Sequence, residues 1–130
     1  MSNYPSDMDL ECIELCDAIN EMKGLRTTYS CSGHDRDCMY VFIRFERIDD
    51  LSPLVFLLGY KVKSFGVESR WQIKLTNRTE NSPVAFLLYS ESRGEQAYNE
   101  SKIIANVIRE WLKPVGVNKE FDEKYNLTEF

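Results

Sequence analysis

Apolar and small residues recur at intervals of three and four positions in two segments of the chain. In the first segment these residues are Met8, Cys12, Leu15, Cys16, Ile19 and Met22, and in the second they are Ala97, Ser101, Ile104, Ala105, Ile108, Trp111 and Leu112. This spacing places the side chains on one face of an α-helix, so both segments are predicted to be amphipathic helices. We expect Ser6 or Asp7 to cap the first helix and Gly24 to end it, and Pro114 to end the second.

Four other segments have the pattern of β-strands. Residues 25–31 and 39–45 are rich in Thr, Tyr, Val, Ile and Phe and flank the polar sequence SGHDRD, which predicts a β-hairpin. Residues 69–76 alternate between polar and apolar side chains, and residues 84–90 are more continuously apolar, with the turn sequence NRTENSP between them. The predicted apolar face of the third strand consists of Trp71, Ile73 and Leu75. These two segments predict a second hairpin.

A short helix is expected between the two hairpins. Asp49 and Asp50 suit a helix start, Pro53 is tolerated in a first turn, and the apolar run LVFLL follows. The predicted order is therefore helix, hairpin, helix, hairpin, helix. It predicts an α+β fold, a two-layer sandwich of an antiparallel four-stranded sheet with helices on one face. We expect residues 1–114 to form this single domain, with residues 115–130 as a charged tail that docks weakly or frays.

Length and charge narrow the classes of protein. The 130 residues fit one domain, and the formal net charge of −5 argues against binding nucleic acid through bulk positive charge. The first residues lack the basic and apolar regions of a secretory signal, and the longest apolar run, LVFLLGY, is too short to span a bilayer. We therefore expect a cytoplasmic protein with no membrane partner, in which thiols stay reduced.

The sequence TTYSCSGHDRDC, residues 27–38, holds two of the four cysteines and the only histidine. Thiolate and imidazole groups are preferred zinc ligands, and Cys31, His34 and Cys38 form a C-x2-H-x3-C pattern that can hold zinc. Cys12 and Cys16 also have ligand-compatible spacing. Because both lie on the apolar stripe of the first helix, we expect them to pack in the core as small hydrophobic residues.

The same turn permits two other kinds of site. Cys31 near His34 has the composition of a thiolate nucleophile with its base, which requires hydrogen-bond reach between the two groups. Ser30 and Ser32 add hydroxyls, and the backbone amides around Ser32, Gly33 and His34 can form an anion-binding nest. A polar hairpin turn without chemistry is the remaining interpretation. The candidate ligand or metal residues are Ser30, Cys31, Ser32, Gly33, His34 and Cys38.

The segment LCDAINEMKGLRTTYSCSG resembles the wybutosine-synthesis methyltransferase family. The matching residues are Thr27, Thr28, Ser30, Cys31, Ser32 and Gly33. That family modifies a guanosine of transfer RNA with S-adenosylmethionine as donor, so the resemblance implies this cofactor and an RNA partner. His34 stands where the family more often has Arg, and the family's later motifs have no counterpart here. The Cys-x-Gly-His stretch also resembles small uncharacterised bacterial and phage proteins, a likeness that implies no activity.

A second candidate surface is the sheet face turned away from the helices. If Val41 and Ile43 face the helices, their neighbours on the same strand face outward. The residues expected on this surface are Arg26, Tyr40, Phe42, Arg44, Arg70 and Lys74. Aromatic and basic side chains on an open sheet stack bases and contact phosphates in several RNA-binding domains. A homodimer interface that buries Tyr40 and Phe42 is the alternative.

The sequence therefore leaves three functions open. The first is a ligand or metal site in the turn from Ser30 to Cys38. The second is an RNA-binding or S-adenosylmethionine-dependent RNA-modifying protein. The third is an interaction module without chemistry, in which Cys31 and His34 would tolerate substitution.

Overall fold

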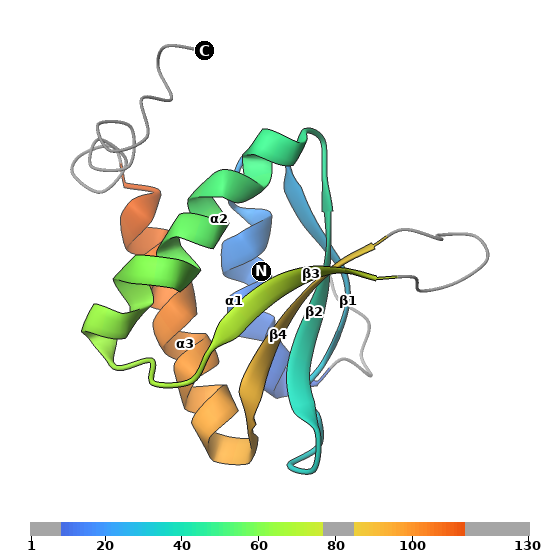
Figure 1. Cartoon of the computed structure of the whole chain (residues 1–130), viewed down its shortest axis with the longest axis vertical. Coiled ribbons are helices and arrows are strands. Elements are labelled where there is room, and N and C mark those ends of the chain that lie inside the picture. Colours follow the sequence, from blue (N-terminus) through green and yellow to red (C-terminus); the bar gives the residue numbers. More distant parts are fainter. Residues whose placement is uncertain (1–8, 77–84, 114–130) are drawn as a thin grey trace.

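The computed structural model describes residues 9–76 and 85–113 and has the predicted order of elements (Figure 1). The regular helices are α1 (Leu10–Asn20), α2 (Ser52–Phe56) and α3 (Gly94–Trp111), and the strands are β1 (Leu25–Cys31), β2 (Cys38–Phe45), β3 (Trp71–Thr76) and β4 (Ala85–Arg93). The predicted turn at residues 77–83, Pro114 and the tail at 115–130 lie outside the described residues.

All strand pairs in the single sheet are antiparallel, in the order β1-β2-β4-β3. The two predicted hairpins form, and pairing of β2 with β4 joins them into one sheet. Among the described residues, the helices lie on one side of this sheet (Figure 1). The predicted α+β fold is therefore confirmed, and we call the other side of the sheet its open face.

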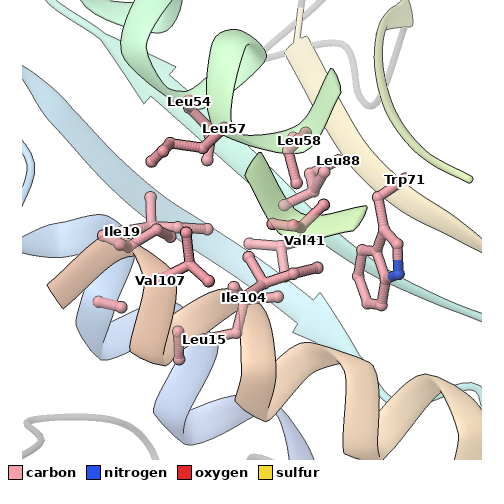
Figure 2. Packing of buried hydrophobic residues seen from close by; sticks show 14 of the residues in the cluster. Leu15, Ile19, Val41, Leu54, Leu57, Leu58, Trp71, Leu88, Ile104 and Val107 are labelled. Atoms are coloured by element: carbon pink, nitrogen blue, oxygen red, sulfur yellow. The ribbon is translucent and has the colours of Figure 1, made fainter. Parts of the chain in front are cut away.

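The core lies between the sheet and the helices. Figure 2 shows Leu15 and Ile19 of α1 packed with Ile104 and Val107 of α3, against side chains of the sheet and of the segment around α2. The labelled contributions from those elements are Val41, Leu54, Leu57, Leu58, Trp71 and Leu88. Both helical cysteines are buried in this core, as predicted. None of the helices in the described part of the chain is both long and apolar enough to cross a membrane.

The first helix begins later than predicted. Leu10 is its first residue and Asp9, in extended conformation, precedes it, so the expected cap at Ser6 or Asp7 is wrong; those two residues lie outside the described part. The Asp9 side chain makes no capping hydrogen bond within the helix. It accepts one from the backbone N–H of Ser32 instead, because the turn after β1 packs against this helix end.

The second helical segment is longer than the short helix that the sequence predicted. A 3-10 turn at Ile48–Leu51 leads into α2, and a π-helical turn at Leu57–Lys61 and a 3-10 turn at Val62–Phe65 continue it. Gly66 ends the segment in left-handed conformation at φ 102°. Val62 is buried in the core, and this burial favours a helical chain beyond Gly59 and Lys61.

The edge strand β3 also differs from the prediction in one respect. Trp71 is buried as expected, but Leu75 leaves 63% of its surface exposed. β3 pairs only with β4 and lies at the edge of the sheet, so the far end of its apolar side is not enclosed.

A β-bulge in β1 decides which of its side chains face the helices. Thr27 pairs with Ile43 but Tyr29 pairs with Phe42, which leaves Thr28 as the extra residue. At this irregularity, Asn20 of α1 accepts a hydrogen bond from the Thr27 N–H at 2.7 Å and donates one to the Thr27 hydroxyl at 2.9 Å. An extra residue shifts every later side chain to the opposite face. Tyr29 and Cys31 therefore lie on the open face.

Candidate functional site

The turn between β1 and β2 folds back over the beginning of α1. Gly33, His34 and Asp35 all have left-handed backbone angles, at φ 83°, 50° and 67°. The Gly33 carbonyl accepts hydrogen bonds from the Arg36 and Asp37 N–H groups at 3.0 and 2.9 Å. A side chain at Gly33 would collide with the Asp37 carbonyl, so glycine is required on both steric and conformational grounds.

This turn is also fixed to α3. The Tyr98 hydroxyl accepts a hydrogen bond from the Asp35 N–H at 3.1 Å and donates one to the Asp35 carboxylate at 2.9 Å. Ser32 is 2% exposed, and its hydroxyl accepts a hydrogen bond from the His34 N–H at 3.2 Å. The backbone at His34 is therefore held by hydrogen bonds at the residue itself and at its neighbour Asp35.

Three different donor groups meet where this turn contacts α1. One ligand atom from each of Asp9, Cys31 and His34 lies within 4.8 Å of the other two. His34 Nε2 is 3.8 Å from Asp9 Oδ2, and the two side chains are 64% and 21% exposed. The same Asp9 oxygen accepts the Ser32 N–H at 2.8 Å. We call these three residues the Asp9–Cys31–His34 cluster.

The thiol of this cluster lies beside an aromatic hydroxyl. Cys31 pairs with Tyr40 across the β1–β2 ladder, and its sulfur accepts a hydrogen bond from the Gly33 N–H at 3.4 Å. Burial, and after it the proximity of Cys31 and Tyr29, raise the pKa of Tyr40 to about 12. Tyr40 therefore stays protonated at neutral pH, as a hydrogen-bond donor between the cluster and the open face.

Of the other predicted ligand residues, Ser32 and Gly33 adjoin the cluster through their backbone N–H groups, and the rest lie outside it. In the described part of the chain, the donor cluster contains Asp9 but not Cys38, which begins β2 and pairs with Arg93 of β4. Cys12 and Cys16 are core residues. Burial raises the pKa of Cys12 to about 12, and a hydrogen bond from the Ser30 side chain offsets only part of that effect. The Ser30 hydroxyl thus interacts with Cys12 of α1 rather than with the cluster.

Sequence reasoning missed Asp9 as a site residue. It precedes Cys31 by 22 positions and carries the same sequence signal as any acidic residue at a helix start. Only its position at the beginning of α1, under the turn that follows β1, brings it to Cys31 and His34. Its place directly before the first helical residue is the one feature that could have singled it out.

Aromatic rings gather on the open face. The centroid of the Tyr29 ring is 6.2 Å from that of Tyr40 and 6.3 Å from that of Phe42, and the Tyr40 and Phe42 rings meet edge to face at 5.6 Å. Tyr29, which the prediction omitted because the bulge could not be foreseen, is 50% exposed. Leu87 and Tyr89 of β4 continue the same two rows across the sheet.

Positive charges border these rings. Arg26 and Arg44 are direct cross-strand partners one step further along β1 and β2, and both are exposed. Lys74 of β3 lies over the Tyr89 ring, with its Nζ 4.9 Å from the ring centroid. Arg70 is exposed just before β3, at the edge of the sheet. The predicted surface residues are thus brought together, apart from Arg70 at the margin.

No protein-family model matches this chain, and neither a curated protein nor a solved structure does. Function is therefore inferred from the geometry of the chain itself.

Proposed function

We propose that this chain binds a single-stranded nucleic acid, RNA in particular, across the open face of its sheet. The main observation behind the proposal is that Arg26 and Arg44 lie directly opposite each other on β1 and β2. Like charges directly opposite each other destabilise an antiparallel strand pair. No carboxylate of the described residues forms an ion pair with either side chain. A phosphate group between the two guanidinium groups would remove the repulsion and accept paired hydrogen bonds from both.

The neighbouring rings supply the second half of such a site. On the open face, Tyr29 and Phe42 form the next cross-strand pair after Arg26 and Arg44, so a strand whose phosphate lies at the arginines has its bases over the rings. Stacking of a base on an aromatic side chain contributes about 1–3 kcal/mol and does not depend strongly on the base. Arginines and rings together are therefore suited to a single strand, whose bases are accessible, rather than a duplex.

The net charge of the chain limits how binding can work. With a formal charge of −5, attraction must come from the local group of Arg26, Arg44 and Lys74. Three phosphate contacts to a single strand give a slope of about −2 in a plot of log affinity against log salt concentration. Binding is expected to be salt-sensitive but much less so than that of a strongly basic protein.

The test is fluorescence polarisation with labelled single-stranded RNA, single-stranded DNA and double-stranded RNA over a series of salt concentrations. Tyr29→Ala should weaken binding by about five- to hundredfold, the loss of one stacked base. Arg44→Gln should reduce the salt slope by about 0.7. Tyr60→Ala is the matched control, because Tyr60 is 58% exposed but belongs to the helical layer.

Three results would contradict the proposal. One is a complete absence of salt-dependent binding to any single strand. Another is a homodimer on this face, recognised by a molar mass that rises with protein concentration and returns to that of the monomer in Tyr29→Ala. Equal losses in Tyr29→Ala and Tyr60→Ala would also place the binding elsewhere.

RNA is preferred over DNA because the segment from Thr27 to Gly33 resembles a family that modifies transfer RNA. The same resemblance extends the proposal to methyl transfer from S-adenosylmethionine, which predicts that this compound raises the melting temperature of the chain.

All four cysteines are unpaired, which supports a reducing compartment such as the cytoplasm.

A further inference from the structure

We infer that Asp9, Cys31 and His34 form a binding site for a zinc ion at the junction of the β1–β2 turn and α1. This site goes beyond nucleic-acid binding and does not depend on it. The observation behind it is the convergence of a carboxylate, a thiol and an imidazole from two distant parts of the sequence, with their ligand atoms within 4.8 Å of one another. Those three groups are the protein ligands that zinc uses.

The distances suit a tetrahedral ion. Zinc bonds of 2.0–2.3 Å place neighbouring donor atoms roughly 3.3–3.7 Å apart at tetrahedral angles. The separation of 3.8 Å between His34 Nε2 and Asp9 Oδ2 is close to that range. The upper limit of 4.8 Å within the cluster leaves at most about 1.5 Å to be closed. Side-chain rotation achieves this without moving the backbone, since most of the His34 side chain is exposed.

Backbone groups already orient two of the three ligands. The Ser32 N–H holds Asp9 Oδ2 at 2.8 Å, which leaves further lone pairs of the carboxylate for an ion. The Gly33 N–H donates a hydrogen bond to the Cys31 sulfur at 3.4 Å, which orients this sulfur beside the other two ligand atoms. Outer hydrogen bonds of this kind fix ligand orientation in metal sites.

The mixture of donors selects the metal. Magnesium and calcium prefer six or more oxygen ligands, whereas one sulfur, one nitrogen and one oxygen favour zinc or a similar transition metal. Three protein ligands leave one position of a tetrahedral zinc ion for water or a substrate, as in catalytic rather than structural sites. Because Tyr98 and the Gly33 carbonyl hold the turn independently, we expect removal of zinc to leave the fold intact.

The test uses untagged full-length protein, freed of metal with a chelator, and cobalt(II) as a spectroscopic probe. The expected result is one cobalt per chain with the strong visible bands of tetrahedral coordination and a thiolate-to-cobalt charge-transfer band, both abolished by zinc. Cys31→Ser should lose the charge-transfer band. His34→Gln and Asp9→Asn should bind at least about tenfold more weakly.

The matched control is Cys38→Ser, which removes a partly buried thiol from the other end of the same turn but outside the cluster. It should bind cobalt like the unaltered chain. The inference is overturned if the unaltered chain shows no saturable binding, if Cys31→Ser binds as well as it does, or if Cys38→Ser loses binding to the same extent. Circular dichroism establishes that each variant is folded, and the exposed His34 gives a variant that cannot fail for lack of packing.

Discussion

Glu100 of α3 is a buried carboxylate that needs several hydrogen-bond donors, and its replacement gives a quantitative test of the structure. Its side chain is 3% exposed. The two carboxylate oxygens accept hydrogen bonds from the Glu68 N–H (2.9 Å), the Ser69 N–H (3.1 Å), the Trp71 indole N–H (3.0 Å), the Ser92 hydroxyl (3.4 Å) and the Gln96 amide (3.4 Å). This one carboxylate thus fastens the loop before β3, and β3 itself, to α3.

Glu100→Gln keeps the shape of the side chain but replaces one acceptor oxygen with a donor. If the amide nitrogen faces Trp71, the indole N–H loses its partner, at about 1–3 kcal/mol. The hydrogen bonds from Glu68 and Ser69 become neutral, with a loss of about 1 kcal/mol each. A neutral amide is less costly to bury than a carboxylate, which returns part of this loss. We expect a net destabilisation of about 3 kcal/mol, or a fall in melting temperature of about 10 °C.

The effect must depend on pH in a particular direction. Burial raises the pKa of Glu100, but the hydrogen bonds from Trp71, Ser69 and Glu68 outweigh it, so the folded pKa lies below the ordinary value of 4.5. A lowered folded pKa means that the stabilisation is complete above the unfolded pKa and is lost as pH falls through the folded one. The difference between the unaltered chain and Glu100→Gln should therefore shrink as pH falls from about 7 to about 3.

Urea unfolding followed by tryptophan fluorescence measures this difference directly. Trp71 and Trp111 are 4% and 5% exposed, so unfolding moves both into water. Glu95→Gln is the control, since Glu95 is an exposed residue in the first turn of the same helix, and it should change stability by less than about 0.5 kcal/mol. A Glu100→Gln variant within about 1 kcal/mol of the unaltered chain, or a difference that is constant with pH, would refute the reasoning.

Two further predictions concern the turn and the thiols. Gly33→Ala should lower stability by about 1–3 kcal/mol in thermal unfolding, because φ is 83° and the added methyl meets the Asp37 carbonyl. Gly59→Ala, with no atom within 4 Å of the new methyl, should be neutral or slightly stabilising, and equal losses in the two would contradict this account. With a pKa of about 12, only about one Cys12 thiol in ten thousand is ionised at pH 8. Iodoacetamide labelling of the folded chain should therefore spare Cys12 and react with the partly exposed Cys31, and equal labelling would show that the first is not buried.

The chemistry of the site could be predicted from sequence only in part. Only two residues separate Cys31 from His34 in the chain, so any turn keeps them near each other. Asp9 could not be assigned, because its distance from Cys31 depends on how α1 packs beside β1. Cys38 looked equivalent to Cys31 by spacing, yet the three left-handed residues from Gly33 to Asp35 direct the turn toward Asp9 instead.

The open face was predicted in outline for similar reasons. The alternation along β2 correctly predicted that Val41 and Ile43 face the helices and that Arg44 faces away from them, because a regular strand has a fixed period of two. In β1 the same rule fails after Thr27. The bulge lies where Thr27 exchanges hydrogen bonds with Asn20, a residue of another element, and the sequence of the strand itself does not predict it.

By itself, the sequence determined the type and order of the elements and the apolar face of each helix, because these follow from residue periodicity within short segments. Tertiary structure alone decided where α1 begins, how far the segment around α2 extends, and that Tyr29 and Cys31 lie on the open face. It also decided that Asp9 joins Cys31 and His34. Each of these depends on a hydrogen bond or a buried contact between residues of different elements, whose geometry exists only once the helices have packed on the sheet.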